Sequence, residues 1–154
     1  MRTRRQILIN AAGLLAGAAI GPGAGLQSAS ATPAMMRAAI RKVVGEAPLR
    51  KGRVKLDLPP LIENGNAVPM TISVESPMTE SDHVKAIHVF NEKNPQPYVV
   101  SVRLGPRAGK AAIAARIRLA DSQTVIAIAE MSDGSFWSDE ADVVVTLAAC
   151  VEGL

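Results

Sequence analysis

Short runs of β-branched and other apolar residues, each ended by a proline, glycine or asparagine turn, fill most of the chain after residue 50. The expected strands are residues 54–58, 68–75, 84–90, 98–104, 111–119, 124–131 and 143–147. The Asn64-Gly65 step between the first two favours the positive φ angles of a tight turn. About seven short strands with this spacing predict an all-β fold, an immunoglobulin-like antiparallel β-sandwich. An open barrel is the alternative.

Three features of the sequence predict whether individual segments are buried or solvated. The run 125–129 is almost wholly apolar, which predicts a central strand. Arg116 and Arg118 alternate with apolar residues, so one face of their strand is expected to be solvated. The acidic cluster Asp139, Glu140 and Asp142 precedes the last expected strand and is interpreted as a solvated turn. The exposed positions are therefore expected on this turn and on one face of the strand that carries Arg116 and Arg118.

One short helix is expected at residues 33–45, before the strands. Met36, Ala39, Ile40 and Val43 recur at steps of three and four residues, with basic side chains on the other face. Gly45 is the expected C-cap, and a proline three residues later prevents the helix from continuing.

Residues 1–31 have the three regions of an export signal. A basic start leads into a short apolar run, which ends at the cleavage pattern Ala29-Ser30-Ala31. The apolar run is too short to span a bilayer. The pair Arg4-Arg5 favours a twin-arginine signal, although an ordinary Sec signal also begins with positive charge. The sequence therefore predicts a periplasmic protein.

Removal of that signal changes the charge balance. The full chain has 17 basic and 14 acidic residues, and three of the basic ones lie in the signal, so the remainder has no net charge. Four aromatic residues offer no stacking platform for bases. No nucleic-acid or membrane partner is predicted. Residues 32–147 are expected to form one sandwich domain and residues 148–154 a C-terminal arm, because terminal residues without packing partners fray.

Cys150 is the only cysteine of the chain. No internal disulfide can form, so in an exported protein this thiol is expected to be reactive or to make an intermolecular bond. A small buried apolar filler is the alternative, which is less favoured so close to a terminus.

No other constellation predicts chemistry. His83 and His88 are five residues apart, which in one strand places them on opposite faces and prevents them from binding one metal ion. Solvated histidines and core methionines are favoured over a copper site. No catalytic residue, cofactor or metal site is predicted.

Nine segments of the chain, in order, resemble the SoxY family of sulfur-carrier proteins. They are residues 56–60, 63–65, 68–69, 75–78, 84–87, 94–95, 116–120, 123–125 and 132–137, followed by Cys150 close to the C-terminus. This resemblance implies an immunoglobulin-like sandwich, twin-arginine export and a complex with a second sandwich subunit, SoxZ.

The resemblance also implies a non-catalytic role in periplasmic thiosulfate oxidation, with Cys150 as the covalent attachment point. The implied transient clients are a haem-containing thiosulfate-coupling enzyme, a sulfate-releasing hydrolase and a sulfane dehydrogenase. Two alternatives stay open: an interaction module joined by an interchain disulfide at Cys150, and a carrier for a different periplasmic oxidation system.

The tail departs from the family pattern. The usual family tail is Gly-Gly-Cys-Gly-Gly, whereas residues 148–154 are Ala-Ala-Cys-Val-Glu-Gly-Leu. Alanine and valine restrict the backbone far more than glycine does. Residues 143–149 can therefore continue as one strand, but we expect a free arm that begins at residue 148.

Overall fold

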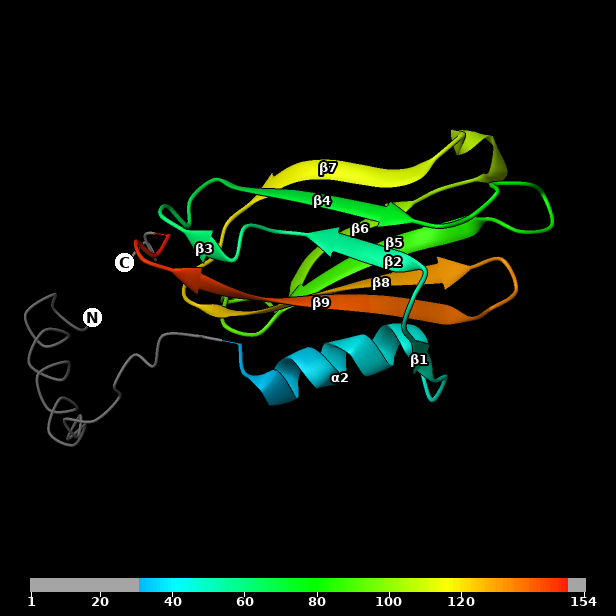
Figure 1. The fold of residues 1–154 in the computed structure, drawn as a ribbon. Coiled ribbons are helices and arrows are strands. Elements are labelled where there is room, and N and C mark those ends of the chain that lie inside the picture. The colour runs from blue at the N-terminus through cyan, green and yellow to red at the C-terminus, as the bar shows by residue number, and fades with distance from the viewer. Residues whose placement is uncertain (1–30, 150–154) are drawn as a thin grey trace, which may run out of the picture.

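Two β-sheets face each other, and one helix covers the outer side of the larger sheet (Figure 1). The computed structural model describes residues 31–149. The elements are α2 (Pro33–Val44), β1 (Leu49–Arg50), β2 (Val54–Asp57), β3 (Leu61–Ile62), β4 (Val68–Val74), β5 (Val84–Asn91), β6 (Tyr98–Arg103), the 3-10 helix η1 (Pro106–Ala108), β7 (Ala111–Ile117), β8 (Gln123–Met131) and β9 (Phe136–Val145). All of the predicted signal except Ala31 lies outside the described residues.

The larger sheet has the strand order β1-β9-β8-β5-β6, with β3 paired to the far end of β9, and the smaller sheet has the order β2-β4-β7. The long strands pair antiparallel, whereas the two-residue strands β1 and β3 pair parallel to β9. The predicted sandwich with one short N-terminal helix is confirmed, and so is the central place of residues 125–129 within β8. Because the described strands form two separate sheets, the open barrel is not the fold.

Aliphatic side chains fill the space between the sheets. β4 alternates strictly, with Val68, Met70, Ile72 and Val74 buried and the residues between them exposed. This period of two is what a strand with one solvated face requires. Four of the five methionines after the signal are buried, as predicted, and Met35 is exposed.

The helix forms a second, smaller core on the outer side of the larger sheet. Met36, Ile40 and Val44 pack against Phe90 and Ile128 of β5 and β8. Gly45 ends the helix as predicted, with φ of 61° and a backbone N–H that donates to Arg41 O at 2.9 Å. No described helix is both long and apolar enough to cross a membrane.

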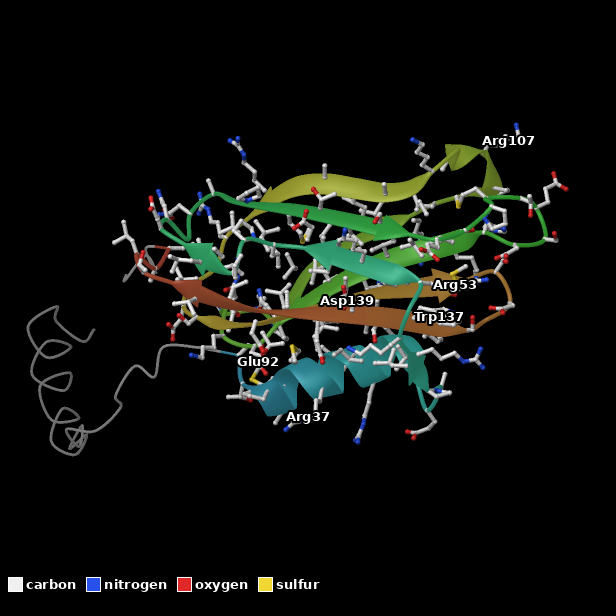
Figure 2. The ribbon with its side chains drawn as sticks, viewed as in Figure 1. Arg37, Arg53, Glu92, Arg107, Trp137 and Asp139 are labelled. Atoms are coloured by element: carbon white, nitrogen blue, oxygen red, sulfur yellow. The ribbon has the colours of Figure 1, made fainter. Side chains whose placement is uncertain are left out.

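The interpretation of Asp139, Glu140 and Asp142 as a solvated turn is wrong, because β9 begins at Phe136 and contains all three. Asp139 Oδ2 accepts the Leu56 backbone N–H at 2.9 Å and so joins β9 to β2; Figure 2 marks Asp139 midway along β9. Asp142 Oδ1 accepts the Thr124 hydroxyl at 2.7 Å. An acidic run can form a strand where each carboxylate has a partner or faces water.

Candidate functional site: the anchored base of the C-terminal tail

Cys150, the predicted attachment residue, lies outside the described residues, and so does the rest of the predicted arm beyond Ala149. The structure describes the residues that lead to Cys150, and these form the base of the tail. Ala149 is the last of them, and its side chain is buried. The position of the base determines where the thiol can act.

Three backbone hydrogen bonds anchor the tail base to two loops. The Gly65 N–H donates to Leu147 O at 2.8 Å, and the Leu119 N–H donates to Gly65 O at 2.8 Å. The Ala149 N–H then donates to Leu119 O at 3.1 Å. Gly65 and Leu119 therefore hold the chain on both sides of residue 148.

The last residues of β9 are held on both edges as well. On one edge, the Val144 N–H donates to Pro60 O and the Thr146 N–H to Ile62 O, both at 2.9 Å. On the other, the Val145 N–H donates to Ser122 Oγ at 2.9 Å. Short β3, which the sequence did not predict, therefore serves to fix the end of β9.

The positive φ angle expected at Gly65 is wrong, since the glycines with positive φ in the described chain are Gly45, Gly52, Gly109 and Gly134. Glycine is needed at position 65 for space instead. A Cβ there would lie 2.3 Å from Leu119 O and 2.8 Å from Ala149 N. The Asn-Gly pattern signals a turn, but nothing in it signals this close approach of three backbone segments.

Asn94 ties the first described residue to the same region. Ala31 N–H donates to Asn94 O at 2.8 Å, and Asn94 Nδ2 donates to Arg118 O at 2.7 Å. Asn94 Oδ1 accepts the Ala120 N–H at 3.0 Å. Residues 118–120 therefore connect to both ends of the described chain, which emerge at the same end of the sandwich (Figure 1).

The two alanines before Cys150 do not behave as expected from sequence. They do not lengthen the strand, because β9 ends at Val145. Nor is the chain free at residue 149, where the backbone is hydrogen bonded and the side chain buried. Any free arm begins after Ala149, so the reach to Cys150 is one residue.

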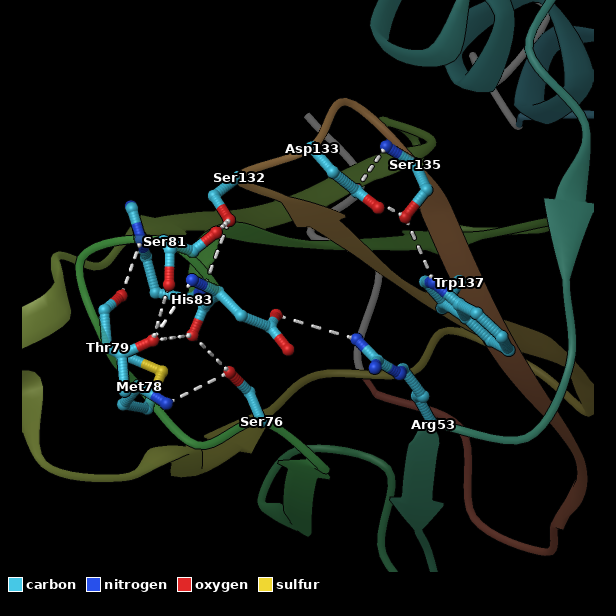
Figure 3. A network of polar contacts seen from close by, with 11 residues as sticks. Arg53, Ser76, Met78, Thr79, Ser81, His83, Ser132, Asp133, Ser135 and Trp137 are labelled. Atoms are coloured by element: carbon cyan, nitrogen blue, oxygen red, sulfur yellow. Dashed lines mark hydrogen bonds and ion pairs between the residues drawn. The ribbon is translucent and has the colours of Figure 1, made fainter.

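Segments 75–78 and 132–137 belong to the family resemblance and follow β4 and β8 at the end of the sandwich away from the tail base. Residues 79–83 connect the two segments (Figure 3): Ser76 Oγ donates to Asp82 O at 3.4 Å. The His83 N–H donates to Ser132 Oγ at 3.1 Å, and the Ser132 N–H donates to His83 O at 2.8 Å. His83 Nδ1 lies 3.0 Å from Thr79 O. The hydrogen bonds around these segments therefore hold the β4–β5 loop to the β8–β9 loop. They do not involve the tail base.

The prediction of a solvated His88 is wrong, because its side chain is buried within the larger sheet. Its Nδ1 lies 2.9 Å from Ser101 Oγ and 3.3 Å from the Tyr98 hydroxyl. Burial lowers the pKa of His88 below the ordinary value of 6.5; the field of Glu130 opposes this shift and that of Arg103 adds to it. Among residues 31–149, no three His, Cys, Asp or Glu residues gather as metal ligands.

The lowered pKa of His88 predicts a loss of stability in acid. The unfolded chain takes up a proton near pH 6.5, whereas the folded chain does so only at lower pH, so the free energy of unfolding falls as pH drops below about 6.5. Urea titrations at pH 7.5 and 5.5 should show a smaller pH-dependent loss for His88→Gln than for the native protein. Equal losses would contradict the assignment to His88.

Comparisons with known proteins give one family and one fold. The family model of sulfur oxidation protein SoxY matches residues 40–150. The solved structure of the sulfur carrier protein SoxY from Chlorobium limicola f thiosulfatophilum is 24% identical, with a TM-score of 0.62, and the match covers 74% of this chain and 98% of that one. No curated protein gives a significant sequence match.

Superoxide reductases share the fold more distantly. The putative enzyme from Thermotoga maritima is 18% identical with a TM-score of 0.51, over 64% of this chain and 87% of that one. The superoxide reductase from Nanoarchaeum equitans is 13% identical with a TM-score of 0.51, and the match covers 62% of this chain and 100% of that one. At these identities the likeness shows a common sandwich and carries no chemistry over.

Proposed function

Because the chain belongs to the SoxY family of sulfur oxidation proteins, we propose that it is a carrier that holds thiosulfate-derived sulfur on Cys150. The observation that carries this proposal is the family match over residues 40–150, which extends to the one cysteine of the chain. The anchored tail base supports it, since it fixes the residue before Cys150 at one end of the sandwich.

The proposed loading step joins the Cys150 thiol to the sulfane sulfur of thiosulfate. One S–S bond forms, one proton is released, and two electrons pass to a haem-containing coupling enzyme. A sulfate-releasing hydrolase then adds water across the bond between sulfane and sulfonate sulfur, which leaves a cysteine persulfide and sulfate. A sulfane dehydrogenase oxidises the outer sulfur of the persulfide to a sulfonate, with oxygen from three water molecules, and six electrons pass to the dehydrogenase and its electron acceptor. Hydrolysis of the remaining S–S bond then releases a second sulfate and returns the Cys150 thiol. The carrier itself supplies the thiol and presents it.

Export to the periplasm by the twin-arginine pathway is part of this proposal. It is supported by Arg4-Arg5 and by the cleavage pattern that ends at Ala31. Cell fractionation should find the protein in the periplasm without its signal. A full-length chain retained in the cytoplasm would contradict the proposal.

A SoxZ-like subunit is the proposed permanent partner. The apolar run of β8 is not the surface it covers, because β8 lies between β9 and β5. We place the partner at β6, the outermost strand of the larger sheet, where Val99 and Val100 are only partly buried and Tyr98 is exposed. Gel filtration of the native periplasmic protein should show a second polypeptide. A stable lone monomer would contradict this.

Electrophoresis of the protein from thiosulfate-grown cells separates the carrier from a disulfide-linked interaction module. The carrier is expected to run as a monomer of this chain without reductant, because its thiol must be available to thiosulfate. A reductant-sensitive dimer that accounts for all of the protein, and that does not support thiosulfate oxidation, would favour the interaction module instead.

A further inference from the structure

Three large aliphatic side chains are exposed at the tail base. Leu61, Val144 and Leu147 are 59%, 54% and 61% exposed, more than any other large apolar residue described. Leu61 and Val144 are direct partners in the β3–β9 pair, and Leu147 follows two residues after β9 ends. We call these three residues the tail-base patch. Leu61 and Val144 lie side by side, and Leu147 is three residues farther along the chain at the same end of the sandwich. Exposed apolar side chains gathered at one end of a domain indicate a surface that another molecule covers.

The short reach of the tail determines when this patch is covered. Ala149 is hydrogen bonded to Leu119 and buried, and the Cα atom of the next residue lies only about 3.8 Å farther along the chain. An enzyme that acts on the Cys150 thiol must therefore approach the sandwich surface itself. A long glycine arm would let the enzyme stay at a distance, but this chain has none before the cysteine.

We propose that the tail-base patch is the docking surface for the client enzymes, which cover it with an apolar wall at the entrance to their active-site cleft. This inference rests on the proposed carrier function. A permanent partner or a second copy on the patch would obstruct the thiol that successive enzymes must reach. A client enzyme covers the tail-base patch only while Cys150 is in its active-site cleft. The patch is therefore buried at the same time as the enzyme reaches the thiol.

An apolar patch also suits repeated docking by different enzymes. Burial of aliphatic area is non-directional, so it does not require each client to match a particular set of hydrogen bonds. The binding must be brief, and a patch of three side chains gives a modest gain in affinity. The permanent SoxZ-like subunit must then lie elsewhere on the sandwich, which agrees with its proposed place at β6.

The test compares Leu61→Ser/Leu147→Ser with the control Leu49→Ser. Leu49 is an exposed leucine on β1, and it pairs with Phe136 at the start of β9, about 26 Å of strand away from Val144. Each protein is incubated with thiosulfate and the purified haem-containing coupling enzyme, and the mass of the Cys150 peptide is followed with time. We expect KM for the carrier to rise at least tenfold in the double variant, with kcat within twofold of native. Leu49→Ser should match the native protein.

Unchanged KM in a double variant that folds normally would overturn the docking surface, while adduct formation on the native protein would leave the carrier function intact. Reaction of Cys150 with a small thiol reagent gives an independent readout in the isolated protein. We expect the same rate in the native protein and the double variant. A faster rate in the variant would show that residues 151–154 of the chain itself cover the patch. If the native protein is a dimer and the double variant is a monomer, the patch is an interface with a second copy of the chain, and the docking proposal is wrong.

Discussion

Replacing Cys150 by serine is expected to abolish thiosulfate-dependent sulfate formation and to leave the midpoint of thermal unfolding unchanged. A serine hydroxyl cannot form the S–S bond that the loading step requires, and the chain has no second thiol to replace it. Position 150 follows the end of β9 by five residues, and the change replaces one sulfur atom by oxygen, so we expect little loss of stability. Activity should fall to the level of a strain that lacks the gene.

The matched control is Val151→Ser, which introduces the same hydroxyl one residue later and keeps the thiol. Sulfate formation and growth on thiosulfate should stay within about twofold of native in this variant. Growth of the Cys150→Ser strain on thiosulfate at the native rate would show that Cys150 is not the attachment residue.

Gly65→Ala is expected to lower the free energy of unfolding by about 3 kcal/mol and to release the tail base. The new methyl group would lie 2.3 Å from Leu119 O, 2.8 Å from Ala149 N and 3.2 Å from a Val145 methyl carbon. Backbone must move to make room, and the three hydrogen bonds among Gly65, Leu119 and the tail weaken together. Denaturant unfolding measures the loss, and faster labelling of Cys150 by a bulky thiol reagent reports the release.

Gly105→Ala is the control for this substitution. No neighbouring atom lies within 4 Å of a Cβ at position 105, and its φ of −127° suits any residue. We expect stability and labelling close to native. If Gly65→Ala behaves in the same way as Gly105→Ala, the tail base is not anchored as the structure shows.

The strands were predictable because their burial follows a local period. β4 and α2 alternate apolar and polar residues at the spacing that each element requires, so their positions and buried faces could be predicted from sequence. The acidic residues in the middle of β9 broke that pattern. Its place in the sheet depends on the Leu56 and Thr124 partners of Asp139 and Asp142, which lie 83 and 18 residues away along the chain.

The candidate site was predictable only in part. Cys150 could be singled out because it is the one thiol of the chain, and the family segments gave it a role. The anchoring of Ala149 could not be predicted, because it depends on Gly65 and Leu119, whose backbone groups converge only in the fold. The burial of His88 was missed for a similar reason, since Tyr98 and Ser101 come from the adjacent strand β6.

The most direct measurement of the carrier role is the mass of the C-terminal peptide after the native protein reacts with thiosulfate and the haem-containing coupling enzyme. We expect a thiosulfonate adduct on Cys150 that reductant removes, and a persulfide in its place after the hydrolase is added. The adduct should be absent when the coupling enzyme is heat-inactivated. A peptide that keeps an unmodified Cys150 thiol throughout, while the enzymes turn over a known SoxY carrier, would contradict the carrier role of Cys150.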